Sequence, residues 1–399
     1  MGDGDFSLRT EEIASKSNSN PKSFDEVNFI RLDPSLPKKL ERLGAPKLPR
    51  CYNCGTCTAT CPLSKERSEF PRLLIRYAVL GAEERLLSSF RLWLCYYCGD
   101  CAETCPREAD PGSIMMAARR YAIMKNSPGG LGFMFYESLK TCVSALLVLT
   151  FFIFSGIYFL KGPAVKPVSL PSFLSFELIH KVGILFFVFL TLSFLISLIS
   201  FMRGVLGSSK GVSLKNKVYS WLSALIPTIK ESLIQLNLLK CGNRFRYLAH
   251  LSVFWGWIGL FVASITNLVM FGVEKSPLYP VPPSRILGVL SGLFFLFGTV
   301  YFIYKRIKKD EESVKFSHFS DWLFIVLLLL SSISGFMLTL SLYLNLTSFS
   351  YIMFVLHLLV VADLLILMPF TKFAHSFYRP LAIWANNALL KMSDVEEVV

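Results

Sequence analysis

Two copies of one four-cysteine phrase lie close together in the first third of the chain. The first, CYNCGTCTATCP, begins at Cys51, and the second, CYYCGDCAETCP, begins at Cys95. In each copy the cysteines are separated by two, two and three residues, and a proline follows the last cysteine. In a reducing compartment, cysteines clustered in this way bind metal more often than they form disulfides. The sequence therefore predicts two neighbouring metal centres.

This spacing is the one that holds [4Fe–4S] clusters in bacterial ferredoxins, where the fourth cysteine of each phrase binds the other cluster. Four thiolates also suit zinc, but zinc ribbons pair two C-x2-C knuckles across a long gap. We therefore expect two [4Fe–4S] clusters with crossed ligands. The expected ligands of one cluster are Cys51, Cys54, Cys57 and Cys105, and those of the other are Cys95, Cys98, Cys101 and Cys61.

Composition separates a polar head from an apolar body. Of the 399 residues, 17% are charged and 53% are hydrophobic, whereas soluble domains carry roughly 25% charged residues. The charged residues gather in 1–140, and the polar first residues lack the apolar core of a secretory signal peptide. We expect a flexible leader over 1–44, with a strap for a partner protein as the alternative. A cytoplasmic two-cluster domain over 45–130 and a membrane domain over 131–399 are expected to follow.

The fold class predicted is mainly α. Between the two phrases, apolar residues recur at helical spacing and Gly81 follows them as a stop signal, which indicates two short helices. The segment SIMMAARRYAIMKN, after the second phrase, is also expected to be helical. The head is then a ferredoxin-type domain whose clusters are covered by helices.

Six apolar runs are long enough to cross about 30 Å of hydrocarbon. We expect a six-helix transmembrane bundle with spans at 141–160, 182–202, 247–272, 286–304, 322–343 and 350–371. The segments 203–246 and 305–321 together carry 13 Lys and Arg residues, against five in the segments on the other side. The positive-inside rule then places both termini in the cytoplasm, at an inner membrane. Segment 218–240 is expected to form a helix on that membrane surface or beneath the head, with a kink at Pro227.

Histidines in membrane spans are costly and are therefore functional candidates. His357 and His375 are 18 residues apart, which on one continuous helix puts both rings on one face about 27 Å apart. At matching depths, His250 is the expected partner of His375, and His180 that of His357. Each pair would supply axial ligands to one b-type haem, so one or two haems are expected. His318 is expected to be a surface residue.

Other residues carry weaker signals. Arg244, Arg246 and Arg379 flank the inner histidine pair and are expected to meet haem carboxylates or anionic lipid headgroups. Asp363, deep in the last span, either handles protons or is bonded to a neighbouring Ser or Thr. Cys142 and Cys241 lie outside the phrases and are expected to be inert.

Two families share these patterns. Residues 45–125, with PR-x2-IR-x3-LG and LWLC between the phrases, resemble the small iron–sulfur protein of heterodisulfide reductase, its C subunit. The stretch HLLVVADLLILMPFTKFAH resembles the γ-subunit of respiratory nitrate reductase, a quinol-oxidising cytochrome b whose pattern recurs in the E subunit of heterodisulfide reductase. In that cytochrome family a second histidine lies on the third span, where this chain has Leu260.

The fusion of such a head to such a body resembles the C subunit of the quinone-interacting membrane-bound oxidoreductases. The resemblance implies electron transfer between menaquinol and soluble flavin/iron–sulfur proteins that serve adenylylsulfate reductase. Membership of another heterodisulfide or sulfite-reduction complex is one alternative, and a non-redox anchor or transporter is another. The net charge of +13 falls largely in the membrane loops, so nucleic acid is not an expected partner.

Overall fold

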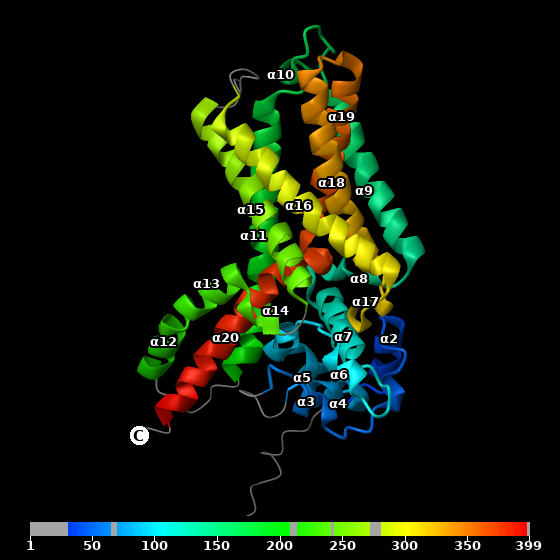
Figure 1. The fold of residues 1–399 in the computed structure, drawn as a ribbon, viewed down its shortest axis with the longest axis vertical. Helices are drawn as coiled ribbons and strands as arrows, with labels where there is room; N and C mark the ends of the chain where they lie inside the picture. Colours follow the sequence, from blue (N-terminus) through cyan, green and yellow to red (C-terminus); the bar gives the residue numbers. More distant parts are fainter. Residues whose placement is uncertain (1–30, 65–69, 208–213, 241–242, 272–280, 397–399) are drawn as a thin grey trace, which may run out of the picture.

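The computed structural model describes residues 31–64, 70–207, 214–240, 243–271 and 281–396. These residues form helices, turns and loops, with no strand among them. Figure 1 shows the short helices of the head gathered at one end and the long helices extending away from it. The prediction of a mainly α fold with an N-terminal head is confirmed.

Short helices build the head around a hydrophobic core. They are α2 (Leu36–Arg42), α3 (Thr56–Ala59), α4 (Arg72–Leu80), α5 (Glu83–Leu87), α6 (Asp100–Glu103) and α7 (Pro111–Asn126). The longest of these, α7, begins where Asp110 accepts a hydrogen bond from the backbone N–H of Ser113 at 3.0 Å and where Pro111 presets the first turn. Helix α4 ends at Gly81, as the sequence predicted.

Helix α2 lies within the segment for which the sequence indicated a flexible leader. Its residues Leu36 and Leu40 are completely buried, and they belong to the same core as Leu74 and Tyr121. Burying two leucines contributes about 1.5–3 kcal/mol each, which is enough to hold a short helix in place. The head therefore begins before residue 44, and residues 1–30 lie outside the described residues.

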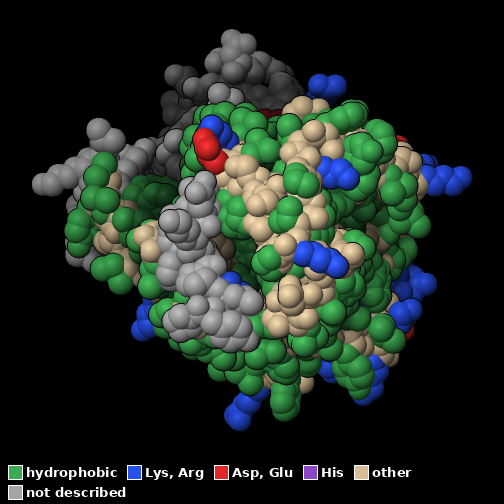
Figure 2. Space-filling view, turned by 90° about the horizontal axis from the view of Figure 1, so that it is seen from above, with side chains coloured by type: hydrophobic (Ala, Val, Ile, Leu, Met, Phe, Trp, Pro, Cys, Tyr) green, Lys and Arg blue, Asp and Glu red, His purple; other side chains and the backbone are tan. Residues whose placement is uncertain are grey.

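Six helices are long and apolar enough to cross a membrane. They are α9 (Leu139–Leu160), α11 (Phe176–Gly207, apolar over Phe176–Ile196), α15 (Arg244–Phe271), α16 (Pro283–Lys308), α18 (Phe319–Tyr343) and α19 (Thr347–Ile366). Seen from the end away from the head, hydrophobic side chains cover most of the surface, with separate Lys and Arg residues among them (Figure 2). The prediction of six helices able to span a membrane is confirmed, although the second one begins earlier than the predicted 182–202.

Helices α15 and α16 pack closely because glycines line their contact. A Cβ atom on Gly256 would approach the backbone of Phe295, and one on Gly298 would meet the carbonyl oxygen of Ala249. Small residues of this kind allow close approach of membrane helices, where packing rather than the hydrophobic effect drives association. This contact fixes the position of His250, which lies next to Ala249 on α15.

The last span ends earlier than the sequence indicated. Helix α19 stops at Ile366, two short 3₁₀ segments follow, and α20 (His375–Glu396) begins at His375. Pro369 has no N–H to continue an α-helix, and Thr371 between the 3₁₀ segments is extended. The expectation that His357 and His375 share one helix face was therefore wrong, because the chain changes course between them (Figure 1).

The segment predicted as one interfacial helix is divided into three. Helices α12 (Leu214–Ser223), α13 (Leu225–Ile234) and α14 (Leu236–Lys240) are separated at Ala224 and Gln235. The first break lies one turn before Pro227, which cannot donate to the carbonyl of Ser223. Lys391 of α20 donates to that carbonyl instead, at 2.7 Å. The segment also contacts the head, because the hydroxyl of Tyr96 donates to Glu231 at 2.7 Å.

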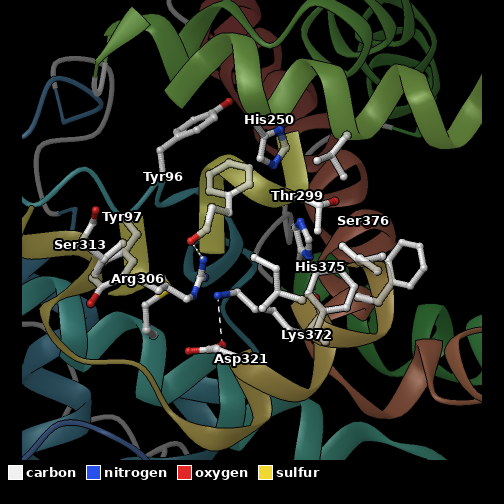
Figure 3. Close-up of a pocket in the computed structure, with 18 of the residues that line it drawn as sticks. Tyr96, Tyr97, His250, Thr299, Arg306, Ser313, Asp321, Lys372, His375 and Ser376 are labelled. Carbon is white, nitrogen blue, oxygen red and sulfur yellow. Dashed lines mark hydrogen bonds and ion pairs between the residues drawn. The ribbon is translucent and has the colours of Figure 1, made fainter. Parts of the chain in front are cut away.

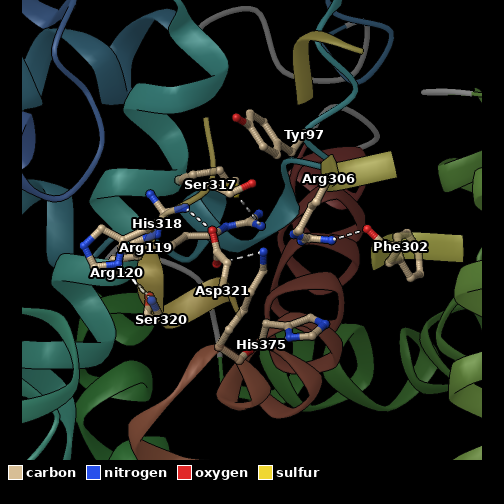
Figure 4. Close-up of polar contacts among 12 residues, drawn as sticks. Tyr97, Arg119, Arg120, Phe302, Arg306, Ser317, His318, Ser320, Asp321 and His375 are labelled. Atoms are coloured by element: carbon tan, nitrogen blue, oxygen red, sulfur yellow. Dashed lines mark hydrogen bonds and ion pairs between the residues drawn. The ribbon is translucent and has the colours of Figure 1, made fainter. Parts of the chain in front are cut away.

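A buried ion cluster joins the head to the spans. Asp321, at the start of α18, accepts from Arg120 of α7 at 2.6 Å and pairs with Lys372 at 3.0 Å (Figure 4). The side chains of Asp321 and Arg120 are 6% and 8% exposed. Arg120 also donates to the carbonyl of Leu43 at 2.8 Å. The carboxylate of Asp321 therefore links α18, α7 and the segment before α20.

His318, expected at the surface, is instead buried at the start of α18. It is 5% exposed, and its Nδ1 caps the helix by accepting from the backbone N–H of Ser320. Its ring also stacks on Tyr136. Burial lowers the pKa of His318 to about 4, so the imidazole is neutral.

We expect Asp321→Asn to destabilise the protein markedly. The change leaves the buried charge of Arg120 and the partly exposed charge of Lys372 without a carboxylate, and breaking a buried pair costs about 3–5 kcal/mol. The thermal unfolding midpoint of the detergent-solubilised chain should fall. As a control, Glu177→Gln breaks the exposed pair with Lys181 and should leave the midpoint unchanged. Equal midpoints for the two variants would contradict this role of Asp321.

Candidate functional site

The two cysteine phrases fold into the same local structure. Asn53 and Tyr97, each two residues after the first cysteine of its phrase, have left-handed backbones with φ of 57° and 54°. Gly55 and Gly99 also have positive φ, of 96° and 108°, and each precedes a one-turn helix. Glycine adopts this conformation without the steric cost that a side chain would add. The repeated phrase thus encodes a repeated loop.

Each loop borders a cavity, and the cysteines sort between the two cavities. One cavity is lined by Cys51, Cys54, Cys57 and Cys105. The other is lined by Cys61, Cys95, Cys98 and Cys101. In both cases three cysteines come from one phrase and the fourth from the other. The structure therefore brings together the two crossed sets that the spacing indicated.

The cysteine geometry suits a cluster better than a single ion. Among the described residues, no three His, Cys, Asp or Glu side chains converge closely enough to hold one metal ion. A tetrahedral zinc site needs four ligand atoms about 2.3 Å from one point, whereas each thiolate of a cubane binds a different iron. Burial raises the pKa of Cys57 to about 11 and that of Cys61 to about 12. Burial thus favours the neutral thiol, and these side chains become thiolates only beside a cationic centre.

A larger cavity of about 380 Å³ lies between the head and the spans (Figure 3). Its volume is that of a cavity for a small molecule or cofactor. Apolar side chains such as Trp257 and Phe295 line it from the spans, and Trp93 lines it from the head. His250 and His375 both line this cavity.

The two imidazoles are spaced as a pair of axial ligands would be. The ring centres of His250 and His375 are 6.4 Å apart. Metal–imidazole bonds are about 2 Å long, so two rings on opposite sides of one metal have centres roughly 6 Å apart. The pair predicted from depth along the spans is therefore brought together at a distance that fits one iron between the rings.

The Nδ1 atom of each ring is held by a neighbour. Nδ1 of His250 bonds the side-chain oxygen of Gln235 at 2.7 Å, and Nδ1 of His375 bonds the carbonyl oxygen of Lys372 at 2.5 Å. Such bonds fix the tautomer and leave Nε2 as the metal-binding atom. Burial lowers the pKa of His375 to about 3. Its ring is therefore neutral, as ligation requires.

Cations surround the cavity in excess of carboxylates. Arg246, Arg306 and Arg379 all line it, whereas Arg244 does not. Arg246 donates to the carbonyl of Tyr96 at 2.9 Å. Among the described residues, the buried Nε atoms of Arg306 and Arg379 have no hydrogen-bond partner. Unpaired guanidinium nitrogens in a buried site fit a ligand that carries carboxylates.

Two consecutive tyrosines connect the cavities. Tyr96 and Tyr97 line both the central cavity and the cavity of Cys95, Cys98 and Cys101. The carbonyl of Cys95 accepts from Arg119 at 2.6 Å and from Arg379 at 3.4 Å. The second cysteine loop is therefore fixed directly against the histidine cavity.

The outer histidines are placed differently. His180 bonds the carbonyl of Phe176 at 2.6 Å, and His357 bonds the hydroxyl of Ser334 at 2.9 Å, in both cases through Nδ1. Within the described residues, no ring contact joins these two histidines as one joins the inner pair. Asp363 accepts a hydrogen bond from the hydroxyl of Thr150 at 2.7 Å, as expected if this carboxylate is bonded to a neighbouring Ser or Thr. Cys142 is buried, and Cys241 lies outside the described residues.

Sequence reasoning missed several residues of the site. Gln235 lies in a segment whose apolar period indicated a continuous helix, and its positive φ of 58° turns its side chain toward His250. Arg306 was noted only as a loop charge, and Lys372 only as part of the last span's tail.

Comparison with known proteins agrees with this division of the chain. Residues 47–109 match the family model of the 4Fe-4S dicluster domain. Residues 160–392, more than half of the chain, match the family model described as citrate utilization protein B. The head is thus a dicluster iron–sulfur domain, attached to a second family's membrane-type body.

The head is similar to iron–sulfur subunits of heterodisulfide reductases. The chain is 34% identical over 72 residues to the C subunit of the H(2):CoB-CoM heterodisulfide,ferredoxin reductase of Methanothermobacter thermautotrophicus, covering 17% of this chain and 39% of the relative. It is 41% identical over 44 residues to the iron-sulfur C subunit of the CoB–CoM heterodisulfide reductase of Methanopyrus kandleri, covering 11% of this chain and 23% of the relative. The likeness to this heterodisulfide reductase protein is therefore confirmed for the head, and it covers well under half of each relative.

We expect Cys61→Ser to damage the centre of the second phrase. In the structure Cys61 lines the same cavity as Cys95, Cys98 and Cys101. The loss of iron and of paramagnetic signal should therefore match that of Cys98→Ser and differ from that of Cys54→Ser. Electron paramagnetic resonance of the reduced protein, with iron counted per chain, would separate the two centres. A spectrum for Cys61→Ser that matched Cys54→Ser would contradict the crossed ligand sets.

Proposed function

Because the chain belongs to the citrate utilization protein B family and carries a dicluster head, we propose that it is a membrane electron-transfer protein. It would exchange electrons between a membrane quinol, such as menaquinol, and soluble flavin/iron–sulfur partners. One observation carries the proposal: two imidazoles with ring centres 6.4 Å apart lie in a cavity that shares Tyr96 and Tyr97 with the second cysteine loop.

In this proposal His250 and His375 hold a b-type haem in the central cavity. Such a haem supplies a one-electron centre when it is bound. Gln235 and the carbonyl of Lys372 orient the two rings. The unpartnered Nε atoms of Arg306 and Arg379 would bind the haem carboxylates. The apolar lining excludes water from the ligands. His180 and His357 remain the proposed ligands of a second haem.

The head then lies on the cytoplasmic side. The excess of Lys and Arg in segments 203–246 and 305–321 supports this orientation for both termini. The two cysteine sets, Cys51/54/57/105 and Cys61/95/98/101, would hold the two clusters. The histidine cavity shares Tyr96 and Tyr97 with the cavity of Cys95, and the two cysteine cavities are linked because each takes its fourth cysteine from the other phrase.

Two identities are possible for the soluble partner. The head's likeness to an iron–sulfur protein of heterodisulfide reductase favours flavin/iron–sulfur partners of that kind, and a link to adenylylsulfate reductase would place the chain in sulfate reduction. The family name of the body favours an enzyme of citrate utilization. Adding adenylylsulfate or citrate to native membranes and recording which one changes the redox state of the clusters would distinguish the two.

The main test is the reduced-minus-oxidised optical spectrum of the purified full chain, with haem counted per chain. We expect a b-type haem signal from the wild-type chain. His250→Ala and His375→Ala should each abolish the part of this signal that comes from the central cavity. His318→Asn changes a buried histidine outside the cavity, keeps a helix-capping side chain, and should retain the signal. A count of two haems per chain would support His180 and His357 as ligands of a second haem. A count of one would exclude that role for them. Intact clusters without any haem would show that the cytochrome proposal is wrong.

We expect Gln235→Gly to weaken haem binding without breaking the fold. Glycine suits the left-handed backbone at this position but removes the oxygen that orients His250. Loss of such a partner typically reduces metal affinity 10–100-fold. Haem retention and the haem midpoint potential should both change, whereas Gln235→Glu, which keeps an acceptor, should retain haem. If haem retention and the haem midpoint potential were unchanged in Gln235→Gly, Gln235 would have no role in orienting His250.

A further inference from the structure

The two cysteine cavities have opposite surroundings. The cavity of Cys61 and Cys95 is closed off on one side by Tyr96 and Tyr97, which belong to the head–membrane junction. The cavity of Cys51 lies beside α3 and α4, at the end of the head farthest from the spans (Figure 1). There Cys54 is exposed, and the side chain of Tyr52 is 70% exposed. Of the two, the cavity of Cys51 therefore has the more exposed cysteine and aromatic side chains, which a soluble protein can reach.

The accessible cavity carries positive charge. Arg72 and Arg107 line it, and within the part of the chain that the structure describes no carboxylate does. The guanidinium of Arg107 lies 4.1 Å from the centre of the Tyr52 ring, and Arg72 donates to the side chain of Asn53 at 3.2 Å. Both cations are thus held beside the exposed loop. The nearby Glu108 is already paired with Arg50 at 3.4 Å.

We propose that this surface, formed by Tyr52, Asn53, Cys54, Arg72 and Arg107, is the docking site of an acidic redox partner. We call it the outer loop surface. The exposed aromatic ring supplies contact area, which is typical of interface anchors. The two arginines select a partner whose own redox centre is rimmed by carboxylates, because complementary charge raises the rate of productive encounter. This inference rests on the proposed electron-transfer function and names the partner's surface chemistry.

Charge and position exclude other occupants. A second copy of the chain would present the same arginines and be repelled. A membrane surface cannot reach the outer loop surface, because the spans extend from the opposite end of the head (Figure 1). The reaction there is transfer of one electron, in which the head is oxidised and the partner's acceptor is reduced. No bond forms and no proton moves.

Small redox ions of opposite charge test the proposal. The full chain in nanodiscs, with its head chemically pre-reduced, would be mixed with ferricyanide, a trianion, or with hexaammineruthenium(III), a trication. For Arg72→Gln and Arg107→Gln, the oxidation rate with ferricyanide should fall by at least about threefold for each charge removed, from the Coulomb energy of unit charges roughly 6 Å apart in water. The rate with the cation should rise, and both changes should shrink in high salt.

Matched variants complete the test. Arg72→Lys and Arg107→Lys keep the charge and should keep the rates, and Arg85→Gln removes an exposed arginine of α5 that does not line the cavity. An unchanged ratio of the two rates in Arg72→Gln and Arg107→Gln would overturn the proposal. So would an equal change with both ions, which indicates an altered centre rather than altered docking. Because the head is reduced chemically, a failure of quinol to reduce it would count against the proposed function alone.

Discussion

The carboxylate of Asp321 is the contact on which the junction of head and membrane body depends. Arg120 reaches it from the head and Lys372 from the turn before α20. In a buried site removal of this carboxylate leaves both cations without their counter-charge. The carbonyl of the same Lys372 accepts the hydrogen bond from His375. Docking of the head and orientation of a histidine in the cavity are therefore linked through one residue.

Features encoded over short stretches of sequence could be predicted. The cysteine spacing, with its repeated glycine, determines the loop around each centre, since the ligands and the backbone turns lie within one phrase. The spans follow from apolar runs, since hydrocarbon demands about 20 apolar residues in succession. The pairing of His250 with His375 was predicted from depth alone, and the structure brings the rings together.

Features that depend on distant contacts could not be predicted. Arg120 and Asp321 are 201 residues apart, and nothing in either local pattern indicates the other. The end of α19 at Ile366 was obscured because the apolar run continues to Phe370, although Pro369 prevents an α-helix from continuing through it. His318 was expected at the surface for a similar reason: it lies in a basic loop, and only tertiary packing against Tyr136 buries it.

The early end of the last span has a consequence for function. Were α19 to continue as one straight helix, His375 would stay on the axis of that span. Because the chain turns at Pro369 and Thr371, α20 runs along the head instead, where Tyr378 stacks on Trp93 with ring centres 4.4 Å apart. The same helix therefore carries one imidazole of the cavity at its first residue and contacts the second cysteine loop through Arg379. A break in a span thus brings the membrane body and the iron–sulfur head into one continuous site.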